Sequence, residues 1–111
     1  MQRVSITGNL TRDAEVRTVG EREQMVFTVA CSERGREGEA VTFYRCFGQP
    51  SGRVDVLKKG NKVYVEGTLT LREQEREGRS FLNANIHVSH VETIGYRRRT
   101  DWELDFSKDR R

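Results

Sequence analysis

Apolar and polar side chains alternate along most of this chain. A period of two residues is the pattern of a β-strand, in which successive side chains point to opposite faces. The clearest case has Met25, Phe27, Val29 and Cys31 at every second position. Stretches of extended character cover residues 4–7, 14–18, 25–32, 41–47, 62–71 and 80–94. The pattern therefore predicts a protein built mainly of β-strands.

Glycine and charged residues mark the places where these strands should turn or bend. Gly8 and Asn9 predict a bulge or turn after the first stretch. Gly67 predicts a sharp bend within a long strand. Residues 20–23 predict a polar turn, residues 33–40 a charged loop, and residues 73–79 a charged hairpin tip around Gly78.

One segment departs from the strand pattern. Ser51 suits the N-cap of a helix, Lys58 and Lys59 suit its last turn, and Gly60 suits its end. Residues 51–60 are therefore predicted to form one short helix. Three strands, a short helix and two further strands are the order of the five-stranded OB-fold Greek-key barrel, which binds oligonucleotides and oligosaccharides. The predicted fold class is all-β with one short helix.

Length and composition fit one domain with a small core. The chain has 111 residues, of which 33% are charged, with a net charge of +3. Residues 1–96 are predicted to form the barrel, and residues 97–111 a charged C-terminal tail. No apolar run approaches the length of about 18 residues that a membrane span needs, and the first residues lack an apolar targeting region. We expect a cytoplasmic protein that does not bind membranes.

Catalytic and metal-binding patterns are missing from the sequence. Cys31 and Cys46 lie far apart without metal-ligand spacing, and we expect them to be buried, reduced thiols. His87 and His90 differ by three positions, which places them on opposite faces of a regular strand. There is no cluster of carboxylates and no nucleophile–base pair. We therefore expect no cofactor, no metal site and no enzymatic activity.

The segment Phe43-Tyr44-Arg45-Cys46-Phe47 carries the most informative chemistry. As a strand, it places Phe43, Arg45 and Phe47 on one face. Flat rings on which bases stack, with a guanidinium beside them for phosphate, are what single-stranded nucleic acid binding requires. The alternative is that both phenylalanines lie in the core and Arg45 extends along an edge.

Three blocks of the sequence, in order, resemble the bacterial and phage single-stranded DNA-binding proteins over about residues 2–95. The first is Gly8-Asn9-Leu10 followed by Asp13-Ala14-Glu15-Val16-Arg17, which is similar to the opening strand of that family. The second is the aromatic strand ending in Phe47-Gly48. The third is Leu57-Lys58-Lys59-Gly60-Asn61-Lys62-Val63-Tyr64-Val65-Glu66-Gly67-Thr68-Leu69.

The resemblance implies which residues would bind DNA. It assigns base stacking to Phe47 and Phe43, with Arg45 between them. Where the family carries an aromatic after its second strand, this chain has Arg34 and Arg36, and where it carries another near the last hairpin, this chain has Gln74. The electrostatic contacts that we expect are therefore Arg3, Arg45, Arg72, Arg34, Arg36 and Arg76. The remaining cations, such as Arg12, Arg17 and Lys62, are either phosphate contacts or ordinary solvated charges.

The resemblance also implies sequence-independent binding and protection of single-stranded DNA in replication, recombination or repair, in a cytoplasmic, nucleoid-associated protein. It implies a homo-oligomer, a tetramer or a dimer. Replication or repair proteins would be partners through the tail, where Trp102 and Phe106 lie among acidic residues. The alternatives are a primosome-type accessory protein with the same fold that acts mainly through protein partners, a nuclease, and an interaction module that uses residues 102–106.

Overall fold

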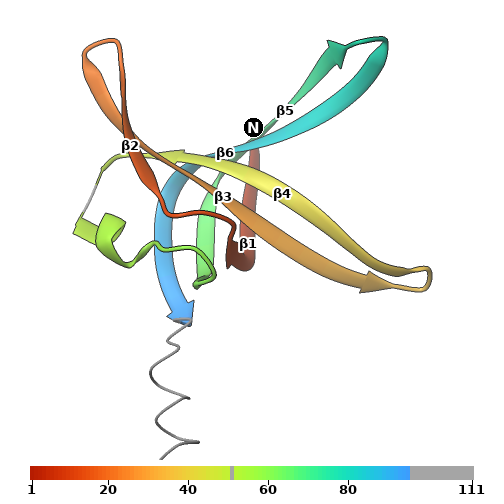
Figure 1. The fold of residues 1–111 in the computed structure, drawn as a ribbon, viewed down its shortest axis with the longest axis horizontal. Helices are drawn as coiled ribbons and strands as arrows, with labels where there is room; N and C mark the ends of the chain where they lie inside the picture. Colours follow the sequence, from red (N-terminus) through yellow and green to blue (C-terminus); the bar gives the residue numbers. More distant parts are fainter. Residues whose placement is uncertain (51, 96–111) are drawn as a thin grey trace, which may run out of the picture.

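The computed structural model describes residues 1–50 and 52–95. Strands make up most of this part of the chain, with one short 3₁₀-helix (Figure 1). The elements are β1 (Gln2–Leu10), β2 (Glu15–Val19), β3 (Arg22–Gly35), β4 (Gly38–Gly48), η1 (Gly52–Val56), β5 (Lys62–Arg76) and β6 (Arg79–Gly95). Ser51 and the predicted tail at 97–111 lie outside the described residues.

The six strands form one sheet that closes on itself. Their order is β1-β5-β6-β4-β3-β2, and a further pairing of β1 with β3, at Asn9 with Ala30 and Leu10 with Val29, completes the barrel. All pairings are antiparallel except that of β4 with β6, which is parallel. The stretches predicted at residues 4–7 and 14–18 correspond to β1 and β2. Counted together as the first strand, they give the predicted order of three strands, a helix and two strands.

The core consists of the inward-facing side chains of this barrel. Val29, Cys46, Val63, Val65 and Ile86 have no exposed surface. Each lies on the face of its strand that the alternating pattern groups together, so for these five residues the period-two signal marks the interior correctly. Leu57, which follows η1 and is 1% exposed, packs into the same cluster and closes one end of the barrel.

Two glycines allow strands to cross at close range. A Cβ atom on Gly8 would lie 2.3 Å from the carbonyl oxygen of Ala30 on β3. A Cβ atom on Gly67 would lie 2.2 Å from the carbonyl oxygen of His87 on β6. The sharp bend predicted at Gly67 is supported by a register shift between Glu66 and Gly67. The bulge or turn predicted at Gly8 and Asn9 is wrong, because β1 continues through both residues to Leu10 and its register with β5 is unbroken as far as Asn9.

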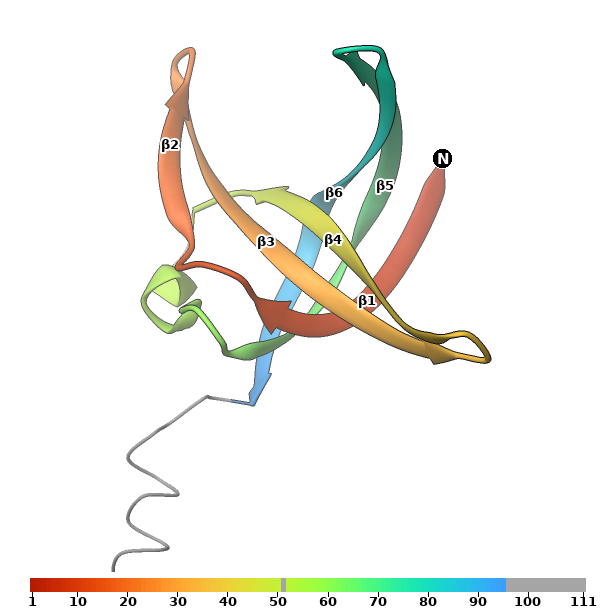
Figure 2. The same cartoon turned by 45° about the vertical axis from the view of Figure 1, so that its right-hand side comes forward.

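Three hairpins project from the barrel in different directions (Figures 1 and 2). They join β2 to β3, β3 to β4, and β5 to β6. The predicted charged loop at 33–40 is wrong, since β3 and β4 pair as far as Gly35 and Gly38. The predicted hairpin tip at 73–79 is likewise shorter, because β5 and β6 pair as far as Arg76 and Arg79. The outer ends of these hairpins extend beyond the core, so both of their faces are exposed to water. Their sequences are therefore as rich in charged residues as those of loops, which is why the sequence pattern predicted loops.

The short helix is present but is tighter and shorter than predicted. It is a 3₁₀-helix over Gly52–Val56 rather than a helix over residues 51–60. Gly60 has a φ of +89° and donates its N–H to the carbonyl oxygen of Leu10, so it turns the chain into β5. None of the helices in the described residues is long and apolar enough to span a membrane.

A bulge in β6 changes the expected position of the two histidines. Glu66 pairs with His90 and Gly67 with Val88, which leaves Ser89 as an extra residue. Ile86 and Val91, which differ by five, therefore both face the core. His87 and His90 both face outward, so the prediction that they occupy opposite faces is wrong.

Candidate nucleic-acid interface

Strand β4 presents two different faces, as its sequence predicts. Cys46 is fully buried and Tyr44 packs against the core, which fixes that face inward. Phe43, on the other face, is 59% exposed, and Arg45 is also exposed. The guanidinium carbon of Arg45 lies 5.5 Å from the centroid of the Phe47 ring. The alternative in which both phenylalanines belong to the core is therefore wrong.

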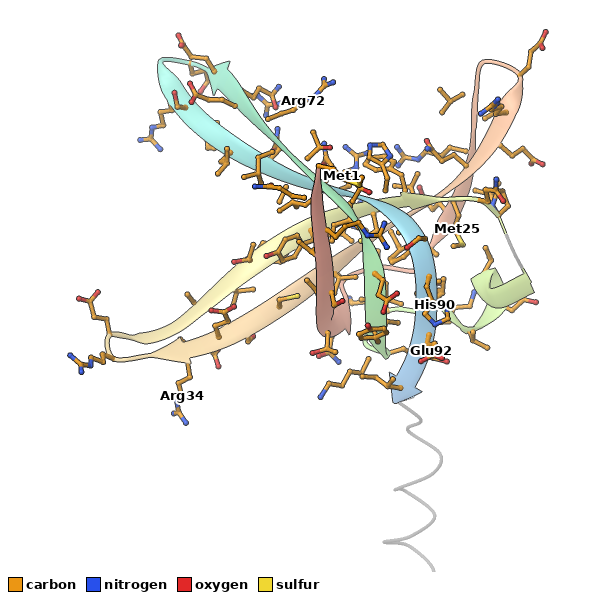
Figure 3. The ribbon with its side chains drawn as sticks, turned by 180° about the vertical axis from the view of Figure 1, so that it is seen from behind. Met1, Met25, Arg34, Arg72, His90 and Glu92 are labelled. Atoms are coloured by element: carbon orange, nitrogen blue, oxygen red, sulfur yellow. The ribbon has the colours of Figure 1, made fainter. Side chains whose placement is uncertain are left out.

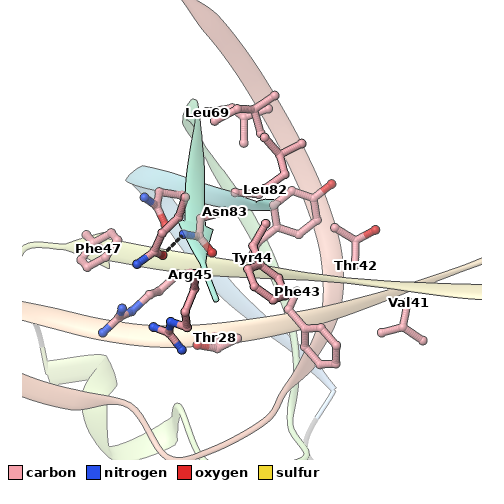
Figure 4. Close-up of a pocket in the computed structure, with 16 residues that line it drawn as sticks. Thr28, Val41, Thr42, Phe43, Tyr44, Arg45, Phe47, Leu69, Leu82 and Asn83 are labelled. Carbon is pink, nitrogen blue, oxygen red and sulfur yellow. Dashed lines mark hydrogen bonds between the residues drawn. The ribbon is translucent and has the colours of Figure 1, made fainter. Parts of the chain in front are cut away.

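This face borders a groove between β4 and the β5–β6 hairpin (Figure 4). The wall on β4 includes Phe43, Arg45 and Phe47, and residues of β6 such as Asn83 and Asn85 also line the groove. The side-chain amide of Asn83 donates a hydrogen bond to Oε1 of Gln74 over 2.8 Å. The groove thus combines rings, a cation and amides, which suit the faces, phosphates and edges of unpaired nucleotides.

Phe81 is an aromatic residue of this groove that sequence reasoning missed. It is 47% exposed and is the Cα partner of Gln74, the position at which the family resemblance leads one to expect an aromatic. The ring is therefore supplied by the facing strand of the same hairpin. The sequence feature that could have revealed Phe81 is the two-residue turn at Glu77 and Gly78. A turn at these two residues pairs Arg76 with Arg79 and therefore Gln74 with Phe81.

The face of the β5–β6 hairpin that carries Gln74 and Phe81 is basic. Because side chains alternate, Arg72, Gln74 and Arg76 share a face on β5, while Glu73 and Glu75 share the opposite one. Arg79, the partner of Arg76, adds a further cation to the first face. Arg76 also lines the groove, so the structure brings two predicted cations, Arg45 and Arg76, to one site.

Arg3 belongs to the outer surface of the sheet. It is the Cα partner of Thr68, which pairs with His87, which in turn pairs with Phe47. One guanidinium nitrogen of Arg3 donates to the hydroxyl of Thr68 over 3.4 Å and another to the hydroxyl of Ser89 over 3.0 Å. These bonds hold Arg3 on the row that leads across the sheet to Phe47.

Arg34 and Arg36 do not join this group. They lie at the end of the β3–β4 hairpin, where Arg34 pairs with Glu39. Figure 3 shows Arg34 at the end of that hairpin, well separated from Arg72 on the β5–β6 hairpin. Neither residue lines the groove. Their contact with DNA stays a prediction.

A polar pocket beside Arg45 gathers two further arginines. Arg12 and Arg17 line it together with Arg45 and Thr28. Nη2 of Arg17 lies 2.9 Å from the carboxylate of Glu15, and both side chains are more than half exposed. Asp13 and Glu15 line the same pocket, so the two interpretations of Arg12 and Arg17, phosphate contacts or solvated charges, both stay predictions.

Both cysteines are free thiols. Burial, followed by the nearby Cys31, raises the pKa of Cys46 to about 12. Cys31 is only partly buried, contrary to expectation, and its pKa is raised by loss of solvent and then by Glu33. The pKa of Tyr44 is raised by burial and then by Cys31 and Glu33. Within residues 1–50 and 52–95, no group of histidine, cysteine and carboxylate side chains could hold a metal ion.

Comparison with known proteins identifies the family. The family model described as "Single-strand binding protein family" matches residues 1–94. The chain belongs to this family. Among curated proteins, this single-strand binding family member is 34% identical over 96 residues to the mitochondrial single-stranded DNA-binding protein rim1 of Schizosaccharomyces pombe. That match covers 82% of this chain and 62% of the relative.

Solved structures agree with the fold. The small single-stranded DNA-binding protein from Streptomyces coelicolor has a TM-score of 0.68 at 21% identity, covering 83% of this chain and 93% of that one. The Plasmodium falciparum SSB in complex with ssDNA has a TM-score of 0.63 at 19% identity, covering 86% and 94%. These matches confirm the predicted OB-fold, and membership of the single-strand binding family confirms the expectation of a non-enzymatic protein.

Proposed function

We propose that this protein binds single-stranded DNA without sequence preference and protects it during replication, recombination or repair. The observation that carries the proposal is the exposed row on β4, in which the guanidinium of Arg45 lies 5.5 Å from the Phe47 ring, beside the 59% exposed Phe43. Every base has a π-face, so stacking on these rings tolerates any sequence. The names of the two relatives and of the Plasmodium complex support the same activity.

The binding energy would come from two sources. Each base stacked on a ring contributes about 1–3 kcal/mol, as judged by alanine substitution in other proteins. Arg45, Arg72, Arg76 and Arg3 would neutralise phosphates and release counterions. The logarithm of the binding constant should then fall linearly with that of the salt concentration, with a slope of about −0.7 per phosphate contact.

Assembly into a homo-oligomer, most simply a homotetramer, is part of the proposal. Strand β1 pairs with β5 from Gln2 to Asn9 but pairs with β3 at Asn9 and Leu10. Its remaining edge offers backbone groups to a second copy. Light scattering during size-exclusion chromatography tests this: a mass near 12.9 kDa, that of one chain, contradicts it.

We further propose that the protein acts in the cytoplasm, associated with the nucleoid, and that residues 97–111 recruit replication or repair proteins. The Schizosaccharomyces pombe relative is mitochondrial, so imaging of a fluorescent fusion must distinguish the two compartments. Deletion of residues 97–111 should remove partner binding and leave DNA binding intact.

Fluorescence anisotropy of a labelled oligothymidylate and of its duplex, across a salt series, tests the central proposal. We expect tight binding to the single strand, weak binding to the duplex, and loss of affinity in the double variant Phe43→Ala/Phe47→Ala. Ile94→Ala is the control, since Ile94 is 50% exposed at the other end of β6. Equal affinity for the duplex, or full affinity in the double variant, would refute the proposal and favour the accessory role through protein partners.

A further inference from the structure

The Phe47 ring lies between two grooves rather than at the border of one. The first is the groove between β4 and the β5–β6 hairpin. The second lies on the other side of Phe47, toward the β2–β3 hairpin. Its lining includes Val19, Gln24, Phe47, Gln49, Pro50 and His87. A strand that lies on Phe47 can therefore continue from one groove into the next without leaving the protein surface.

His87 extends the aromatic surface of β4 onto β6. It is exposed, is the Cα partner of Phe47, and its ring centroid lies 6.1 Å from that of Phe47 at an interplanar angle of 33°. The rings are tilted toward one another rather than stacked. The two rings are therefore neighbours on the same outward face, with His87 exposed and Phe47 partly exposed.

Resting on the function proposed above, we propose that the second groove is a further base-binding subsite for single-stranded DNA, with His87 as its stacking ring. An imidazole is flat and aromatic, and histidine is among the side chains on which unpaired bases stack. Gln24 and Gln49 each carry an amide, which offers both a donor and an acceptor to the edge of a base.

The surroundings of His87 fit a nucleotide rather than a protein segment. Arg22 from β3 lines the same groove and supplies a cation for a phosphate, next to Glu23 of the same strand. On the β5 side of His87, the guanidinium of Arg3 donates hydrogen bonds to the hydroxyls of Thr68 and Ser89. Gly48 and Val88 form the floor between these side chains, where the missing side chain of Gly48 leaves room for Val88, whose Cβ would lie 3.3 Å from a Cβ atom on Gly48.

Anisotropy with oligothymidylates of increasing length tests this subsite. A short oligomer fills the first groove, and only a longer one reaches the second. We expect His87→Ala to weaken binding of the longer oligomers by about 5- to 150-fold, the range that one stacked base supplies. The shortest oligomer that binds should keep its affinity. His87→Phe should restore the wild-type affinity, because the ring is retained.

His90→Ala is the matched control. His90 is the second of the two histidines, lies on the same strand and also faces outward, but its Nε2 lies 3.3 Å from a carboxylate oxygen of Glu92, beyond the bulge. It should bind like the wild type. Unchanged affinity of His87→Ala at every length, an equal loss at every length, or no rescue by His87→Phe would overturn the subsite. Since Phe47→Ala should weaken even the shortest oligomer, intact binding in that variant marks instead the failure of the proposed function.

Discussion

Substitution of Gly67 by alanine tests the close crossing of β5 and β6 on which the barrel depends. The added Cβ atom would lie 2.2 Å from the carbonyl oxygen of His87 and 2.7 Å from Cγ2 of Ile86. The oxygen belongs to the backbone of a paired strand, so it cannot withdraw without weakening the β5–β6 ladder. Overpacking of a core costs about 1–3 kcal/mol. We place Gly67→Ala at the upper end of this range, at about 3 kcal/mol.

Thermal and urea unfolding followed by circular dichroism measure this cost. A loss of about 1 kcal/mol lowers the melting temperature of a domain of this size by about 4–8 °C. Gly35→Ala is the control, because a Cβ atom on Gly35 would meet its nearest atom, the carbonyl oxygen of Gly38, at 3.9 Å. A melting temperature of Gly67→Ala equal to that of Gly35→Ala would refute the argument that a side chain cannot fit between these strands.

Three further predictions concern single side chains. Phe81→Ala should weaken oligothymidylate binding by about 1–3 kcal/mol in anisotropy, whereas Ile94→Ala, which is 50% exposed and does not line the groove between β4 and the β5–β6 hairpin, should not. Glu77 has a φ of +53° in a two-residue turn, so Glu77→Asn should raise the melting temperature by removing up to about 1 kcal/mol of strain; a lower value contradicts this. The pKa of Cys46 is raised from 9.0 to about 12, so stability should be fully present below pH 9 and fall toward pH 12. In urea unfolding, Cys46→Ala should show a shallower fall over that range, and an equal slope contradicts the assignment.

The part of the site on β4 could be predicted because it depends on a single strand. Phe43, Arg45 and Phe47 share a face whatever their neighbours, and the burial of Cys46 settles which face points outward. Phe81 could not be found in this way. Its place depends on which residue of β5 it pairs with, and that depends on whether the turn occupies two residues or seven.

For His87 and His90, the sequence led to a wrong assignment of faces. The alternation argument is valid only for a regular strand, and the extra residue Ser89 reverses it. Nothing in the local sequence marks this bulge. It arises where β6 crosses Gly67 at close range. The cause of the bulge therefore lies on another strand, about twenty positions earlier in the chain.

The sequence by itself determined which side chains share a face on the regular stretches of strand, because the period of two is a property of each such stretch alone; it did not do so past the bulge in β6. It also indicated a bend at Gly67, although only the crossing of β5 and β6 explains why a side chain does not fit there. Only the tertiary structure decided how the strands pair across the barrel. That pairing brings His87 beside Phe47 and Phe81 opposite Gln74, and it depends on contacts between residues far apart in the chain. Since register is set by turns, bulges and closure together, the course of the two grooves is decided only when the barrel is complete.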